Sequence, residues 1–193
     1  MAKRRTPQAV REALLEAGAR LFARGGMAAT NSNQIAREAG MGVGSFYRHF
    51  EDKHALADAL HEDWTHTLRR RSQRAAQAAD GLEAQVRALV EVAVDLVEEH
   101  PDRFRVVSAH PPRRSALRLS LRPVEKRLAE LEAQGELAAG VAPAVAAKAF
   151  EAMQAGVLAW WREDPSRATR EDVIETLVAL HPALAGRVRA SVR

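Results

Sequence analysis

Residues 40–56 read Gly-Met-Gly-Val-Gly-Ser-Phe-Tyr-Arg-His-Phe-Glu-Asp-Lys-His-Ala-Leu. Just before them, one of the polar residues 30–32 can cap a short helix that Gly40 ends, because glycine accepts the left-handed backbone of a helix terminus. The residues from Met41 to Phe50 have the pattern of a second short helix. The stretch therefore predicts two short helices joined by a tight turn, although any small helical hairpin could end in this way.

Apolar residues at helical spacing continue on both sides of this pair, whereas strand signals are scarce and aromatic residues make up only 5% of the chain. Thr6-Pro7 begins a helix that is predicted to stop at Gly25-Gly26, and a longer helix should follow Leu56 toward Gln77. Further helices are expected up to residue 100, over 115–134 with Pro123 as a kink or a start, and over 143–162 and 171–180. The sequence predicts an all-α fold.

The charge is unevenly distributed along the 193 residues. Residues 1–53 hold nine Lys or Arg and five Asp or Glu, so they carry the whole formal net charge of +4. A basic amino-terminal part is expected where a protein meets phosphate, although chance can produce the same imbalance in an arginine-rich chain. Lys3, Arg4 and Arg5 could form an arm along DNA, or could only aid solubility.

Composition excludes several classes of protein. The chain has no cysteine, so thiol redox chemistry and disulfides are excluded. No apolar run reaches the roughly 18 residues of a membrane span, and we expect a cytoplasmic protein with no membrane partner.

Two short helices around a glycine turn, after a first helix, form the geometry of a helix-turn-helix that binds in the major groove of DNA. The run Gly44-Ser-Phe-Tyr-x-His-Phe50, followed by Lys53 and Ala55-Leu56, closely resembles the signature of the TetR family of tetracycline-repressor-like regulators. The resemblance extends back through residues 34–40 and 17–25 and covers roughly residues 8–67. A weaker similarity covers residues 128–137 and 147–161.

The resemblance implies an all-α protein in which an amino-terminal three-helix DNA-binding domain is joined by a linking helix to a carboxy-terminal helical domain. We expect the DNA-binding domain over 8–67, with the helix-turn-helix at about 31–50, and an effector-binding and dimerisation domain over 68–193. It also implies a homodimeric repressor that binds palindromic double-stranded operator DNA and is released by a small-molecule effector of unknown identity. No cofactor is required in this interpretation.

The family signature assigns DNA contacts by position. Most members carry Thr and often Arg near residues 31–33, and Lys or Arg is common at residue 43, so Val43 here suits only apolar contact, such as with a thymine methyl group. Each assignment has an alternative: Tyr47 could cover the rim of the core, His49 could lie at a helix end, and Lys53 could be a solvated cation. Phe46 and Phe50 are assigned to the core. The predicted DNA-binding residues are Asn31, Ser32, Asn33, Val43, Gly44, Ser45, Tyr47, His49 and Lys53.

A single helix-turn-helix makes few base contacts, so the carboxy-terminal domain should form a twofold dimer. The alternative is that its apolar stripes only fill a monomer core. The predicted dimer interface comprises Val145, Ala149, Ala152, Gly156, Val173 and Leu177. An effector pocket could be lined by Trp64, His100, Phe104, Met153 and Trp160, but aromatic residues at helical spacing also build cores.

Signals for an enzyme are absent from the sequence. His61 and His66 do not form the zinc-protease motif, because that chemistry needs a spacing of four residues rather than five. His54, Asp58 and His61 share a helical face and could hold a metal, but a solvated face is the preferred interpretation. We predict a non-enzyme without a metal. The main alternative is a helical interaction or ligand-carrier module that does not bind DNA.

Overall fold

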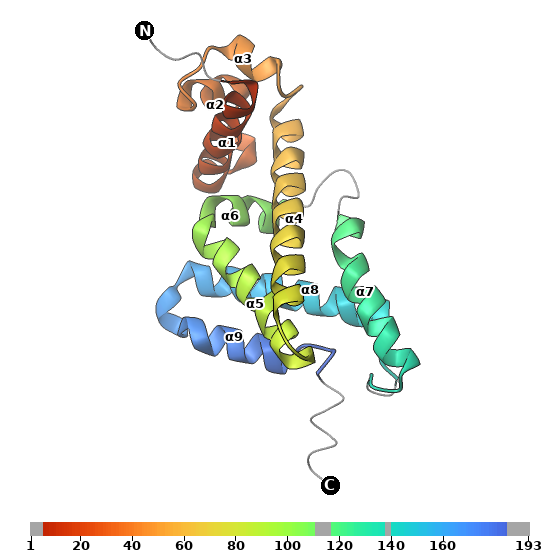
Figure 1. The fold of residues 1–193 in the computed structure, drawn as a ribbon. Coiled ribbons are helices and arrows are strands. Elements are labelled where there is room, and N and C mark those ends of the chain that lie inside the picture. The colour runs from red at the N-terminus through yellow and green to blue at the C-terminus, as the bar shows by residue number, and fades with distance from the viewer. Residues whose placement is uncertain (1–5, 111–116, 138–139, 185–193) are drawn as a thin grey trace. The chain divides into compact units, whose positions relative to one another are not determined.

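The computed structural model describes residues 6–110, 117–137 and 140–184. Within these ranges every regular element is a helix, which confirms the predicted all-α fold (Figure 1). The predicted arm at residues 3–5 lies outside them. The elements are α1 (Pro7–Ala29), α2 (Ser32–Glu38), α3 (Val43–Tyr47), α4 (Lys53–Ala78), α5 (Leu82–Glu99), α6 (Pro101–Ala109), α7 (Leu117–Ala133), α8 (Pro143–Glu163), the 3-10 turn η1 (Pro165–Arg167) and α9 (Arg170–Ala179).

The described residues form two compact units. The first comprises residues 6–64 and 100–110, and the second comprises residues 65–99, 117–137 and 140–184. Helix α4 begins in the first unit and ends in the second. No helix in the described ranges is long and apolar enough to cross a membrane.

The core of the first unit is built from α1, α2, α3, α4 and α6 around side chains with no exposed surface. Thr6 caps α1 by accepting a hydrogen bond from the backbone N–H of Ala9, as predicted. The regular helix of α1 is interrupted at Gly26, as predicted for Gly25-Gly26, because Gly26 leaves the helical region with a φ of 76°. A short helical segment follows this kink and ends at Ala29. The largest fully buried side chains are Leu14, Leu15, Ile35, Phe46, Leu56 and Leu60.

Helix α6 belongs to the first unit, although the sequence boundary at residue 68 placed it in the second domain. Val106 packs into the same core and is 1% exposed. The guanidinium of Arg103, on the same helix, forms ion pairs with Glu12 and Glu16 of α1 and with Asp63 of α4. A buried guanidinium has to be paired, so these contacts tie α6 to the amino-terminal helices. Periodicity along the chain does not reveal such a return.

The second unit packs α5 against α9 and α7 against α8. Helix α9 begins at a capping box, in which Thr169 and Asp172 satisfy each other's backbone N–H groups. Trp161 is buried at the end of α8 and donates from Nε1 to the carbonyl oxygen of Ala168 at 2.9 Å, which fixes the turn into α9. The buried apolar side chains include Val86, Val90, Leu96 and Val97 of α5, Leu158 of α8, and Val173, Ile174, Leu177 and Val178 of α9.

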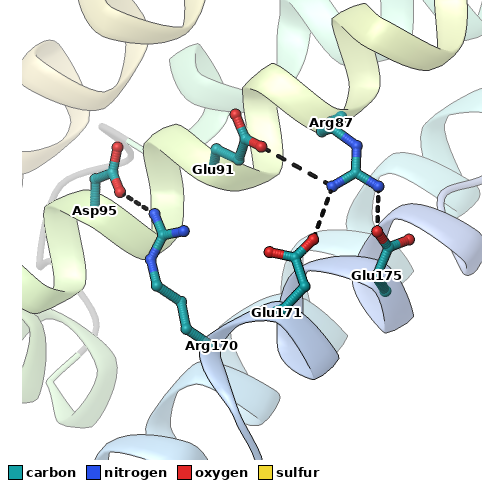
Figure 2. A network of polar contacts seen from close by, with 6 residues as sticks. All are labelled: Arg87, Glu91, Asp95, Arg170, Glu171 and Glu175. Atoms are coloured by element: carbon teal, nitrogen blue, oxygen red, sulfur yellow. Dashed lines mark hydrogen bonds and ion pairs between the residues drawn. The ribbon is translucent and has the colours of Figure 1, made fainter.

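Ion pairs link α5 and α9, and each helix supplies an arginine to carboxylates of the other (Figure 2). Arg87 of α5 pairs with Glu175 and with Glu171 of α9, the latter at 3.3 Å. Arg170 of α9 pairs in return with Asp95 of α5 (Figure 2). The apolar contacts between α5 and α9 supply most of the free energy that holds the two helices together, because exposed ion pairs contribute about 0–1 kcal/mol each.

Two helices differ from their predicted bounds. Helix α3 is shorter than the predicted Met41–Phe50, because Met41 is held in the turn by a backbone hydrogen bond from its N–H to the carbonyl oxygen of Ala36 at 2.8 Å. Pro123 lies inside α7 and does not begin it.

Candidate nucleic-acid interface

The start of α2 is a capping box around Asn31. Its Oδ1 accepts a hydrogen bond from the backbone N–H of Gln34 at 3.0 Å, and Gln34 Oε1 accepts from the N–H of Asn31 at 2.8 Å. The Asn31 side chain is therefore engaged in holding the helix end. Asn33 is exposed and Ser32 half-buried on the first turn of α2.

Helix α3 is anchored to the core by aromatic residues. Phe46 has no exposed surface and Phe50 is 5% exposed, which agrees with their assignment to the core. The Tyr47 ring packs edge-on against Phe46 at 5.4 Å, yet 56% of the residue is exposed. Tyr47 thus covers the rim of the core and still presents its hydroxyl outward. His49 is half-buried beside Phe50, with the ring centroids 6.4 Å apart.

The exposed residues at the start of α3 have small side chains or none, so little protrudes from the backbone there. Val43 is 39% exposed, and both Gly42 and Gly44 are exposed. A Cβ atom added at either glycine would meet nothing within 4 Å, and neither residue has a positive φ. The fold of the chain itself therefore does not require these glycines, and the lack of a Cβ leaves the backbone uncovered at both positions.

Lys53 joins the start of α4 to the end of α1. Its Nζ donates hydrogen bonds to the carbonyl oxygens of Met27 at 2.7 Å and Thr30 at 2.8 Å. Neighbouring Asp52 caps α4 by accepting from the N–H of Ala55. Lys53 has a structural role that the sequence did not indicate, and one of its three donors is left for an external acceptor.

An open hollow of about 300 Å³ brings together five of the nine residues predicted to contact DNA. It contains a lysine, a tyrosine hydroxyl and the amides and hydroxyl of the first turn of α2, which is a donor set that suits a phosphate oxygen. Val43, Gly44, Ser45 and His49 lie outside it. The lining residues are Asn31, Ser32, Asn33, Tyr47, Asp52, Lys53 and His54.

Two residues of this surface were missed by the sequence analysis. His54 lines the hollow, and Arg48 donates from Nη2 to Ser45 Oγ at 2.9 Å. The spacing of three residues between Ser45 and Arg48 places them on one helical face, and this was the signal available in the sequence.

Comparison with known proteins agrees with this geometry. Residues 14–60 match the family model described as bacterial regulatory proteins of the tetR family. A helix-turn-helix transcriptional regulator of Bacillus subtilis, YerO, is 46% identical over 46 residues, which make up 24% of this chain and 16% of that relative's length. Residues 14–60 therefore carry the amino-terminal segment that is typical of the TetR family. That family consists of DNA-binding transcriptional regulators rather than of enzymes, in agreement with the non-enzyme prediction.

Solved structures share the fold of this protein over almost its whole length. The fatty acid degradation regulator FadR of Bacillus halodurans has a TM-score of 0.76 at 15% identity, covering 93% of this chain and 97% of that one. AibR, solved in complex with isovaleryl coenzyme A and operator DNA, has a TM-score of 0.70 at 20% identity, covering 90% of this chain and 98% of that one.

The residues predicted to line an effector pocket fall in both units. Trp64 and Phe104 lie together in the first unit with ring centroids 5.7 Å apart, and His100 precedes α6 as its amino-terminal cap. Met153 and Trp160 are on α8 in the second unit, where Trp160 is 46% exposed.

The predicted dimer residues divide into two sets. Val145, Ala149, Ala152 and Gly156 are all exposed and recur at intervals of three or four along one face of α8. Val173 and Leu177 are 3% and 0% exposed, because α9 turns this face onto the core of its own unit. These two side chains are already covered within one chain.

The histidines of α4 do not gather into a metal site. Within the described ranges no group of three His, Cys, Asp or Glu side chains is placed to hold an ion. His61 is buried and donates from Nε2 to the carbonyl oxygen of His110, so it does not share an open face with His54. Burial lowers the pKa of His61, and the hydrogen bond to His110 offsets part of that shift.

Proposed function

We propose that this TetR-family protein is a cytoplasmic, homodimeric transcriptional repressor that binds palindromic operator DNA and is released by a small-molecule effector. The observation that carries the proposal is the surface formed by α2 and α3, where a donor-rich hollow lies beside the exposed, glycine-lined start of α3. Phosphate oxygens would bind in the hollow and base edges would approach Val43 and Ser45.

Dimer formation is supported by the exposed face of α8. Its small residues Ala149, Ala152 and Gly156 allow a second helix to approach closely, and Val145 at 68% exposure and Trp160 at 46% supply apolar area at the two ends. Two copies related by a twofold axis would present two DNA-binding surfaces to two half-sites.

Release by an effector rests on family membership and on the known complexes of relatives such as AibR. A true effector must change DNA affinity by the same factor by which DNA changes effector affinity. A compound that stabilises the protein thermally but leaves DNA affinity unchanged would not be an effector.

The first experiment is selection of randomised DNA duplexes by the purified protein, followed by sequencing of the retained pool. We expect a palindrome with half-sites about one helical turn or more apart, and an affinity that falls steeply with salt. Tyr47→Phe should weaken binding with unchanged stability, because it removes only the exposed hydroxyl. No enrichment at low salt would reject DNA binding and favour the interaction-module alternative.

Dimerisation is tested by sedimentation of Ala152→Glu, which places a charge on the α8 face. We expect a monomer that keeps its helical content and loses most operator affinity. The control is Ala129→Glu, because Ala129 is an exposed alanine on α7. A wild-type protein that sediments as a monomer at micromolar concentration would contradict the dimer proposal.

A further inference from the structure

The exposed face of α3 carries few groups that can form hydrogen bonds with bases. Val43 offers only methyl groups and Gly44 has no side chain. Ser45 has one hydroxyl, whose oxygen already accepts a hydrogen bond from Arg48. Apolar contact identifies thymine through its methyl group but does not identify a G·C pair. To identify such a pair this face therefore needs a polar donor, and the residues so far named offer only the single hydroxyl hydrogen of Ser45.

Arg48 is placed to supply it. It is the carboxy-terminal cap residue of α3 and is exposed, and its Nη2 lies 2.9 Å from Ser45 Oγ. The guanidinium is thereby held beside the residues that would face base edges. In the first unit Arg20 and Arg103 are occupied by carboxylates, Arg20 by Glu38 at 3.2 Å, whereas Arg48 forms no ion pair within the part of the chain that the structure describes.

We propose that Arg48 is a specificity-determining residue that donates to a guanine in each half-site, and that Ser45 positions its guanidinium. The inference rests on the proposed function. Guanidinium donors match the O6 and N7 acceptors that guanine presents in the major groove. Because Gly42 and Gly44 have no side chains, a base edge can approach the helix closely enough to meet the Arg48 guanidinium.

The test is the same duplex selection carried out in parallel with wild type, Arg48→Gln, Ser45→Ala and the control Arg37→Gln. Arg37 is an exposed arginine on neighbouring α2. Wild type should select a guanine at one position of each half-site. Arg48→Gln should select adenine there, since Gln pairs bidentately with adenine, and should bind the wild-type operator roughly ten- to hundred-fold more weakly.

The other two variants separate positioning from charge. Ser45→Ala should keep the guanine but with a weaker preference over the other bases, because the guanidinium loses its support. Arg37→Gln should select the wild-type sequence. All variants should keep the thermal unfolding temperature of wild type, because Arg37 and Arg48 are exposed and Ser45 is only half-buried.

A phosphate contact would give a different result. Arg48→Gln would then select the wild-type sequence with uniformly weaker binding and a smaller salt dependence, and the proposed base contact would be overturned. This outcome leaves DNA binding by the wild-type protein intact. By contrast, failure of the wild type to enrich any sequence would reject the proposed function together with this inference.

Discussion

Gly18 of α1 lies so close to Leu56 of α4 that a Cβ atom added at residue 18 would come 2.5 Å from Leu56 Cδ2. Leu56 has no exposed surface, so it cannot move aside without disturbing the core of the first unit. We expect Gly18→Ala to lower the free energy of unfolding by about 1–3 kcal/mol, the usual cost of overpacking a core. Gly25→Ala, where a Cβ meets nothing within 4 Å, is the control and should be neutral or slightly stabilising. Equal urea midpoints for the two variants would contradict the close approach.

The two hydrogen bonds of Lys53 predict an effect on stability as well as on DNA affinity. Lys53→Met should lower the free energy of unfolding by about 1–3 kcal/mol, because the carbonyl oxygens of Met27 and Thr30 lose their charged donor. Lys126→Met is the control, since the Lys126 side chain is 81% exposed, and it should change stability by less than about 0.5 kcal/mol. Denaturant unfolding in the absence of DNA measures the free energy of unfolding of both variants. A variant that loses DNA affinity alone would show that Lys53 is only a phosphate contact.

Arg103 should be the arginine on which the first unit depends most. Its side chain is 8% exposed and faces Glu12, Glu16 and Asp63, so Arg103→Met leaves three carboxylates without a cation. We expect a loss of about 2–4 kcal/mol, below the value for a fully buried pair because the carboxylates are partly exposed. Arg105→Met, two residues away and exposed, should cost far less. Similar unfolding curves for both variants would mean that the cluster contributes nothing to stability.

Protonation of His181 should destabilise the second unit in acid. Burial lowers the pKa of His181 to about 4 from an ordinary value near 6.5. Between these values the unfolded chain binds more protons than the folded one, so stability falls as pH drops from about 6.5 toward 4, by about 3 kcal/mol in total. His61 contributes in the same direction, because burial also lowers its pKa.

The variant that tests this pH dependence is His181→Gln, which should show a smaller loss of stability across the same range. His66→Gln changes an exposed histidine and should retain the wild-type slope. Urea unfolding at several pH values between about 7 and 4 measures both. An unchanged slope in His181→Gln would assign the acid sensitivity to other groups.

Local sequence determined most helix boundaries and the residue types of the proposed DNA-binding surface. Helix starts at Thr6 and Asn31 and the turn at Gly40 follow from side-chain capping and from the left-handed backbone of glycine, which neighbouring residues alone decide. Phe46 and Phe50 could be assigned to the core in advance because they are large apolar side chains four residues apart, which places them on one face of the predicted short helix.

Tertiary structure alone decided what depends on contacts between distant segments. Periodicity showed that α9 has an apolar face, but not whether that face meets its own chain or a second copy, and Leu177 proved to be buried within one chain. The return of α6 to the first unit depends on Arg103 meeting carboxylates about 40 and 90 positions away in the sequence, and helical spacing says nothing about such pairs. Lys53 could likewise be recognised as a cation from the sequence, but only the packing of α4 beside α1 places its ammonium on the carbonyl oxygens of Met27 and Thr30.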